Sequence, residues 1–517
     1  MWISDLKDGT YRNPILYSDY SDPDVIRVGE DYFMTASSFI YSPGLPILHS
    51  KDLVNWKVVS YALEEVPFGK YDMPKHGCGV WAPAIRYHNG EYYIYYGDPD
   101  EGIVMVKTKD PFGKWEKPVL VVKSKGWIDT CPFWDDDGQA YLVHGVARSR
   151  SGIKSQLFLH KMSSDGEKLL DEGVRVVDGR IQNPTLEGPK MYKRNGYYYI
   201  FAPAGGVEHG WQVIFRSKNI YGPYEQKIVL RQGNTQVNGP HQGAWVDTQT
   251  GENWFIHFQD IEAYGRIIHL QPVDWVEDWP LMGTNRTYDG TGEPVLRHKK
   301  PNVGKEYPII TLDGPDEFET DKLGIQWQWQ ANYKEEWYSF KQNNSCIRLF
   351  AKQQSDEKVK RVYDMPNVLT QMIPMPIFKA TAKAVLNAKN DFDQCGLIIT
   401  GNTYNYIALI KEEGKNYIQY VSCKGKAQAE EKVIEKKEIN SNEIYFKVDI
   451  HNEHSRLEEM VCQFYYSIDG NNFQKIGNEF HASPGGWVGA KIGLFAVNFA
   501  NCKTEGFADF DYLRFEQ

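Results

Sequence analysis

One segment pattern recurs along the first part of the chain and constrains its fold most. It occurs as SDPDVIRVGEDYF around Asp22, as IDTCPFWDDDGQAYLV around Asp129 and as EGPKMYKRNGYYYIF from Glu187. Each copy has an acidic residue, a nearby proline, an apolar stretch, a turn and an aromatic-rich strand. A unit that recurs around a ring places its equivalent positions at one centre. The repeat therefore predicts three carboxyl groups that meet near one axis.

Five copies of the unit can be traced, and a further phrase marks its later part. The copies are headed near Asp22, Trp81, Asp129, Glu187 and His241, and the phrase reads HSKDLVNW, KTKDPFGKW or RSKNIYGPY. Their spacing of roughly 50–60 residues is close to that of kelch-type propeller blades. The pattern predicts a five-bladed β-propeller over residues 1–305. An irregular β-sandwich with chance similarity is the less favoured alternative.

The sequence changes character near residue 300. RHKKPNVGKEYP is basic and contains proline and glycine, as domain crossings often do. Beyond it, GLIITGNTYNYIALIK, EIYFKVDI and KIGLFAVNF alternate apolar and polar residues as sandwich strands do. We expect an all-β protein whose second domain, residues 306–517, is a β-sandwich. The charged stretch AQAEEKVIEKKEINSNE reads as an exposed hairpin or loop.

Composition excludes two classes of partner. The 517 residues carry a formal net charge of −10, which argues against nucleic acid because phosphate binding needs a basic surface. No segment approaches the run of about 18 apolar residues that a membrane helix needs, so no membrane partner is expected. Aromatic residues make up 14% of the chain. They suit either β-sheet packing or a cleft in which sugar rings stack on aromatic faces.

Cysteine usage and the first residues bear on location. The seven cysteines are scattered, without metal-binding spacing: Cys78, Cys131, Cys346, Cys395, Cys423, Cys462 and Cys502. We expect them to be reduced and structural, which favours a reducing compartment. MWISDLKDGTYRNPIL lacks a basic segment followed by an apolar one. A cytoplasmic protein is therefore favoured, or a periplasmic or secreted one if a signal peptide has been removed.

The three acidic residues are stronger candidates together than singly. A lone Asp-Pro or Glu-Gly pair is a turn motif. In a propeller, however, the innermost strands line the central channel, and a buried carboxylate there suggests function. Asp24 alternates with Asp22 on a strand and should face away. Asp19 is a minor candidate for the site, and the run Asp135–Asp137 reads as a hairpin turn.

The chain resembles glycoside hydrolase family 43, the five-bladed propeller β-xylosidases and α-L-arabinofuranosidases. The resemblance rests on RNPILYSDYSDPDVIRVGEDYF, SPGLPILHSKDLVNW and GVWAPAIRYHNGEYYIYY, and the second domain resembles the concanavalin-like sandwich of β-xylosidase-like members. It covers nearly the whole chain. It implies that Asp22 is the general base, that Glu187 is the general acid, and that Asp129 tunes and orients the acid in an inverting hydrolysis.

The same resemblance implies a set of substrate-binding residues. His241, in GPHQGAW, would lie at the base of the cleft near a central ion or water and the modulating acid. Arg266, in AYGRIIHLQPVDW, would hydrogen-bond sugar hydroxyls. Trp81 and Phe39 would form aromatic walls of the sugar pocket. Each has a structural alternative. His241 could be a structural histidine with internal hydrogen bonds, Arg266 could form a surface salt bridge, and the two aromatic residues could belong to the core.

No cofactor is required by this chemistry, but related second domains often hold a structural calcium. The candidate ligands are Asp316 and Glu317 in GPDEF and Asp511 in ADFDYLRF. They are far apart in sequence, and no EF-hand loop is present.

The expected activity is exo-acting removal of terminal β-D-xylose or α-L-arabinofuranose from hemicellulose oligosaccharides such as those of xylan and arabinoxylan. The phrase WIDTCPFWDDDG differs from the FDPS-like phrase of well-known β-xylosidases, so the sugar preference stays open. The alternatives are an inactive carbohydrate-binding propeller and a propeller hydrolase acting on arabinan or fructan. Fructan enzymes predict NDP and RDP motifs, where this chain has SDP and IDT. An oligosaccharide is the expected partner, and a homo-oligomer is an open alternative.

Overall fold

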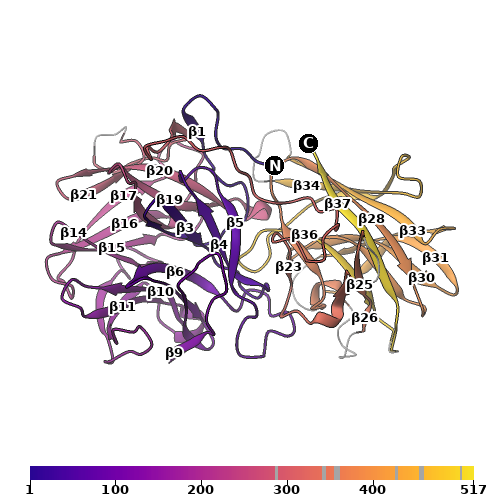
Figure 1. The fold of residues 1–517 in the computed structure, drawn as a ribbon, viewed down its shortest axis with the longest axis horizontal. Coiled ribbons are helices and arrows are strands. Elements are labelled where there is room, and N and C mark those ends of the chain that lie inside the picture. The colour runs from indigo at the N-terminus through magenta and orange to yellow at the C-terminus, as the bar shows by residue number, and fades with distance from the viewer. Residues whose placement is uncertain (286–288, 341–344, 354–360, 425–428, 453–458, 501–502) are drawn as a thin grey trace.

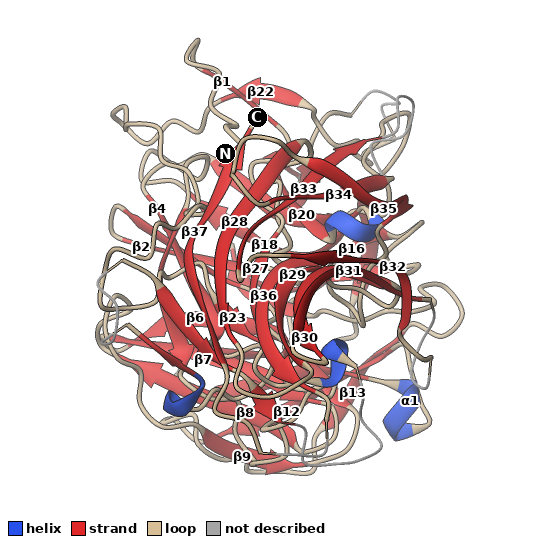
Figure 2. Ribbon diagram, turned by 90° about the vertical axis from the view of Figure 1, so that its right-hand side faces the viewer, coloured by secondary structure: helices blue, strands red, loops and turns tan. Residues whose placement is uncertain are grey.

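Two all-β domains lie side by side in the computed structural model (Figure 1). It describes residues 1–517 except 286–288, 341–344, 354–360, 425–428, 453–458 and 501–502. Strands dominate both domains, and the few helical segments are short (Figure 2). They are α1 (Arg148–Ser151), η1 (Glu262–Tyr264), η2 (Glu335–Trp337) and η3 (Val362–Asp364). Within the described ranges, none has the length and apolar character needed to cross a membrane.

The first domain is the predicted propeller of five four-stranded antiparallel blades. Blade 1 is β2 (Asp24–Val28), β3 (Asp31–Thr35), β4 (Gly44–Ser50) and β5 (Lys57–Leu63). Blade 2 is β6 (Trp81–His88), β7 (Glu91–Asp98), β8 (Gly102–Thr108) and β9 (Val119–Lys123). Blade 3 is β10 (Trp127–Trp134), β11 (Ala140–Val146), β12 (Gln156–Met162) and β13 (Val174–Asp178). Blade 4 is β14 (Lys190–Arg194), β15 (Tyr197–Ala204), β16 (Trp211–Ser217) and β17 (Glu225–Arg231). Blade 5 is β18 (His241–Asp247), β19 (Asn253–Asp260), β20 (Arg266–Val276) and β21 (Trp279–Met282).

The segment before blade 1 runs back along blade 5. The backbone of Leu16 bridges Ile268 of β20, and the Tyr20 amide donates to the Arg266 carbonyl at 3.1 Å. Nearby, β1 (Thr10–Arg12) pairs with β22 (Arg297–Lys299). These contacts tie the last blade to the first, and they place the residues that precede Asp22 beside Arg266.

Each inner strand begins near a residue with left-handed backbone, and these positions recur around the ring: Asp22 (φ 56°), Ala82 (φ 36°), Asp129 (φ 56°), Gly188 (φ 56°) and Gln242 (φ 34°). In blades 2, 3 and 5 a register shift accompanies this residue. Bulges of this kind re-aim side chains and are common next to active sites. The three acids are therefore not strictly equivalent, because Glu187 precedes the left-handed position while Asp22 and Asp129 occupy it.

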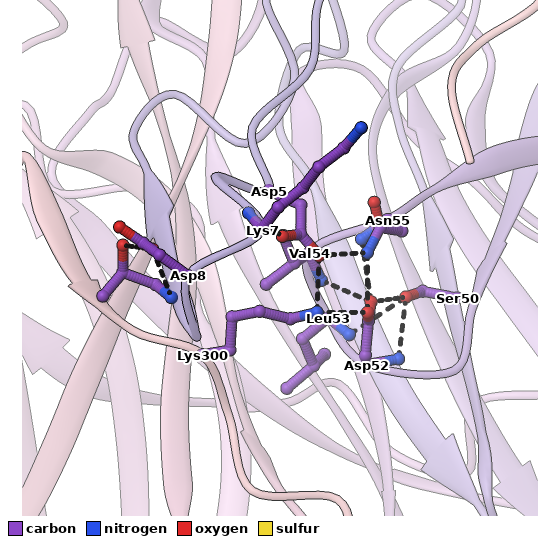
Figure 3. Close-up of polar contacts among 10 residues, drawn as sticks. Asp5, Lys7, Asp8, Ser50, Asp52, Leu53, Val54, Asn55 and Lys300 are labelled. Carbon is purple, nitrogen blue, oxygen red and sulfur yellow. Dashed lines mark hydrogen bonds and ion pairs between the residues drawn. The ribbon is translucent and has the colours of Figure 1, made fainter. Parts of the chain in front are cut away.

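The recurring phrase after the third strand is a turn capped by its own side chain. In blade 1, Asp52 Oδ1 accepts the amides of Val54 and Asn55 at 3.0 and 2.8 Å (Figure 3). Asp110 and Asn219 accept amides two residues ahead in the same way in blades 2 and 4. Aspartate and asparagine favour such turns because their short side chains reach the backbone locally.

The second domain is the predicted β-sandwich of two sheets. One sheet has the order β23 (Gln328–Trp329), β27 (Leu369–Met372), β36 (Lys491–Asn498), β29 (Asp393–Ile399), β30 (Tyr404–Glu412), β31 (Lys415–Cys423) and β32 (Lys432–Ile439), with β26 (Lys352–Gln353) paired to β36. The other has the order β24 (Tyr338–Ser339), β25 (Ile347–Phe350), β37 (Phe507–Glu516), β28 (Phe378–Asn387), β33 (Glu443–Asn452), β34 (Met460–Ser467) and β35 (Gln474–His481). The charged stretch of the sequence contributes the edge strand β32.

The sandwich core continues into the propeller. Tyr17 and Tyr264 of the propeller pack edge to face at 5.3 Å and belong to the same apolar cluster as Trp329 and Leu369 of the sandwich. The backbones of Ser42 and Trp329 exchange two hydrogen bonds across the junction. Burial of aromatic surface at this contact stabilises the two domains as one unit. Elsewhere, Cys131, Cys395, Cys423 and Cys462 are buried thiols, and Cys502 lies outside the described residues.

Candidate active site

Asp22 lies just before β2, buried, and only accepts hydrogen bonds. Its Oδ2 accepts Ser21 Oγ at 2.8 Å and Ser37 Oγ at 2.6 Å, and its Oδ1 accepts Arg266 Nη1 at 3.1 Å. Aspartate tolerates left-handed backbone better than most residues, which suits it to this position. A carboxylate that accepts at both oxygens fits the predicted role of proton acceptor.

Arg266 begins β20 and connects two carboxylates. Its Nη1 contacts Asp22 and donates to Ser21 Oγ at 2.6 Å, while its Nε lies 3.5 Å from Asp260 Oδ2. The guanidinium is buried, with 8% of the side chain exposed. The alternative that Arg266 forms only a salt bridge at the surface is therefore wrong, because its ion pair with Asp22 is buried. Contact with sugar hydroxyls stays a prediction, and the structure adds a bond between this arginine and Asp22.

Asp129 lies in the bulge of β10 and is 2% exposed. Its Oδ2 accepts the amide of Gly188 at 2.8 Å, which ties it to the residue after Glu187. Burial raises the pKa of Asp129 to about 8, and the negative charges of Glu187 and Asp22 add to the effect. At neutral pH the strongly interacting carboxyl groups of Asp129 and Glu187 therefore share a proton.

Glu187 is the more accessible partner in this pair. Its side chain is 26% exposed, and Oε1 lies 2.8 Å from Nε2 of the fully buried His241. His241 therefore contacts the predicted acid itself, where the resemblance implied a place beside the modulating acid. Its Nδ1 is buried and has no protein partner in the described part of the chain.

The predicted aromatic walls belong to adjacent blades. The backbones of Phe39 and Val80 pair in both directions, which sets Phe39 beside the start of β6. Phe39 is 3% exposed, whereas Trp81 is half-buried and donates its indole N–H to the Gly77 carbonyl at 3.1 Å. The guanidinium of Arg150 lies 5.5 Å from the Trp81 ring centre. Their contact with substrate stays a prediction.

A tryptophan of the second domain reaches this site, which the sequence analysis missed. Trp487 lies on the loop between β35 and β36, 6.0 Å from the Trp81 ring and 5.8 Å from the Arg266 guanidinium. It is 55% exposed. With Val207, Gln232, Asp260 and Arg266 it lines a cleft of about 430 Å³. The local sequence signal for this residue is a tryptophan flanked by glycines, in SPGGWVG. Such a segment is typical of a loop, where an aromatic ring is not needed to fill the core.

The remaining acidic candidates have other partners. Asp24 accepts the Ile85 amide and Arg86 Nη1, and Asp135 accepts Lys193 Nζ and the Tyr198 hydroxyl at the end of the β10–β11 hairpin. The hairpin turn predicted for the Asp135–Asp137 run is confirmed.

The three calcium candidates do not form a common ligand set. Asp316 accepts the Trp327 indole N–H at 2.8 Å, Glu317 pairs with Arg514, and Asp511 pairs with Lys383. Among the described residues, no group of three or more metal-ligating side chains was found. Their carboxylates are thus engaged by protein donors, and calcium binding stays an untested expectation.

Both domains match known families. Residues 11–280 match the family model described as glycosyl hydrolases family 43, and residues 315–516 match the β-xylosidase C-terminal concanavalin A-like domain.

Similar proteins span nearly the full length. A putative β-xylosidase of Xylanibacter ruminicola is 40% identical over 95% of this chain and 87% of its own length. A non-reducing-end α-L-arabinofuranosidase of Bacteroides ovatus is 27% identical over 100% of this chain and 97% of its own. The crystal structure of a family 43 protein of Bacillus licheniformis superposes with a TM-score of 0.83 at 27% identity, covering 98% and 99% of the two chains. With matches across both domains, this chain belongs to glycoside hydrolase family 43.

Proposed function

We propose that this glycoside hydrolase is an exo-acting, inverting pentosidase that removes terminal β-D-xylose or α-L-arabinofuranose from hemicellulose oligosaccharides. The similar proteins named above as β-xylosidases and an α-L-arabinofuranosidase support this class of substrate. The two sugars present similar hydroxyl positions, so one pocket accepts either.

One observation carries the proposal: the site combines a proton acceptor with a source of protons. Asp22 accepts hydrogen bonds from three donors, and the pKa of Asp129 is raised to about 8 by burial and by neighbouring carboxylates. An inverting glycosidase needs a carboxylate to activate water and a protonated carboxyl group for the leaving oxygen. Both requirements are met within one carboxyl cluster.

In the proposed reaction, Asp22 takes a proton from a water molecule, and the water oxygen forms the new bond to the anomeric carbon. The glycosidic carbon–oxygen bond breaks, and Glu187 gives its proton to the leaving oxygen. Glu187 suits this step because it is more exposed than Asp129. The proton that Glu187 gives is the one that it shares with Asp129, whose raised pKa retains it in the pair at neutral pH. His241 fixes the orientation of the Glu187 carboxyl group.

The second domain supports action at chain ends. Trp487 lines the cleft from the sandwich side and approaches both Trp81 and Arg266. A groove closed on one side accepts the end of an oligosaccharide more readily than its middle. Stacking of a sugar face on an exposed indole would add affinity there.

The direct test compares aryl β-D-xylopyranoside with aryl α-L-arabinofuranoside. Wild-type protein is expected to hydrolyse at least one of them, and the ratio of kcat/KM identifies the preferred sugar. Asp22→Asn removes the base and should lower kcat roughly 10²–10⁴-fold on both. Asp24→Asn is the matched control, because Asp24 is also buried but contacts Arg86. No turnover by the wild type would contradict the proposal and favour an inactive binding propeller or an arabinan- or fructan-active one.

Replacing the predicted acid should separate substrates by their leaving groups. Glu187→Gln cannot donate a proton, so kcat on xylo-oligosaccharides should fall roughly 10²–10⁴-fold. An activated aryl glycoside needs little protonation and should lose far less. The two losses are measured by steady-state kinetics. Equal losses on both substrates would show that Glu187 is not the general acid.

Asp129 links activity to stability through pH. Its carboxyl has a pKa of about 8 in the fold and about 4 in an unfolded chain, so folding stability is lost as pH rises through about 8. Asp129→Asn buries no charge, and its Tm should exceed that of the wild type at pH 9, with the difference disappearing near pH 4. The wild-type kcat/KM should fall above pH 8, as the proton is lost.

The control for this prediction is Asp135→Asn. Burial raises the pKa of Asp135, but hydrogen bonds from Lys193 and Tyr198 outweigh it and leave the pKa lowered. This substitution should therefore destabilise the protein at neutral pH, with a smaller effect in acid. Calorimetric scans from pH 4 to pH 9 measure both variants. A lower Tm for Asp129→Asn at pH 9 would contradict the raised pKa.

A further inference from the structure

One buried carboxylate lies where three distant segments meet. Asp19 belongs to the segment before blade 1, and its Oδ1 accepts the backbone amide of Arg266, the first residue of β20, at 2.8 Å. Its Oδ2 accepts the amide of Gly489, at the end of the Trp487 loop of the sandwich, also at 2.8 Å. The two oxygens of one side chain thus join blade 5 to the second domain.

The junction is closely packed. A Cβ atom at Gly265 would lie 2.5 Å from the Asp19 carboxyl carbon, and one at Gly489 would lie 2.8 Å from the Gly265 nitrogen. Gly265 also has a φ of 77°, which side chains rarely adopt. Next to it, the Ala490 amide donates to the Ala263 carbonyl at 2.7 Å. The two backbones therefore approach each other directly, with the carboxylate beside them.

The surroundings explain how a carboxylate is held there. Asp19 is 5% exposed, and burial raises its pKa, while the charges of Lys491 and Arg266 and the two amides oppose that shift. Lys491 is itself buried, which lowers its pKa to about 8, and its ammonium lies 4.3 Å from the Tyr41 ring centre. An acidic side chain at such a site needs hydrogen-bond donors, and the amides of Arg266 and Gly489 supply them.

Both attached segments carry residues of the cleft. Arg266 contacts Asp22, and Trp487 lies two residues before Gly489 and lines the cleft with Arg266. We propose that Asp19 is a positioning residue, which fixes the Arg266 backbone and the Trp487 loop relative to each other and so sets the affinity of the sugar pocket. It acts through these residues and does not itself contact the substrate. This inference rests on the proposed pentosidase function.

Asp19→Asn tests the inference because asparagine keeps the shape but has only one acceptor oxygen. One of the two amides then faces an amide group that cannot accept. We expect KM for the preferred aryl pentoside and Ki for the free pentose to rise together, about 5- to 20-fold, with a smaller change in kcat. Hydrogen exchange at the Gly489 amide should accelerate. Thermal stability alone would not report this split between KM and kcat.

The matched control is Asp52→Asn. Asp52 is also buried and also accepts two backbone amides, but it lies on the β4–β5 turn (Figure 3). The strand register places this turn at the end of blade 1 opposite Asp22, because Ser50 pairs with Tyr32 whereas Asp24 pairs with Thr35. Asp52→Asn should lower Tm and leave KM, Ki and exchange at Gly489 unchanged.

Gly489→Ala approaches the same junction from the sandwich side and covers the case in which Asp19→Asn does not fold. Its Cβ would push the loop away from Gly265, so KM and Ki should rise as they do in Asp19→Asn. Unchanged KM and Ki in the folded variants of an active wild type would overturn the role given to Asp19. A wild type that hydrolyses neither pentoside would instead contradict the proposed function.

Discussion

The gathering of three carboxyl groups at one end of the propeller axis, two of them buried and one partly exposed, is the constraint on which the rest of the site depends. Like charges in a poorly solvated place repel strongly, so each charge must be balanced or neutralised. Arg266 balances Asp22. The repulsion between Asp129 and Glu187 is instead removed by a bound proton, since burial and neighbouring charge raise the pKa of Asp129 to about 8. The same repulsion that costs folding stability thus keeps a proton available for chemistry.

The backbone and the second domain provide the geometry. Asp22 and Asp129 hold left-handed conformations that direct their side chains from the ends of inner strands, a form of local strain found at functional sites. Apolar clusters of the blades pack beside both positions, with Tyr20 and Val25 near Asp22 and Cys131 near Asp129. Because Trp487 and Gly489 come from the sandwich, the cleft is a product of both domains.

Local sequence patterns predicted the repeated features but not the long-range contacts. Five blades followed from units that each place a polar or acidic head before an apolar strand, and the side-chain caps at Asp52 and Asp110 explain the phrase that marked them. The offset of Glu187 from the left-handed position was not visible, because a one-residue shift leaves the pattern unchanged. Trp487 and Asp19 were missed as cleft and junction residues because their contacts join segments hundreds of residues apart, which no local pattern records.

In the proposed mechanism Asp22 and Glu187 act as base and acid, and water attacks the sugar directly. The stereochemistry of the first product distinguishes this mechanism from one that passes through a covalent intermediate. Proton NMR during hydrolysis of an aryl β-D-xylopyranoside, or of the corresponding α-L-arabinofuranoside if that is preferred, resolves the anomer released before mutarotation. Direct attack by water inverts the anomeric carbon, so α-D-xylose should appear first from the β-xyloside. Initial release of β-D-xylose would show retention and contradict the assigned roles.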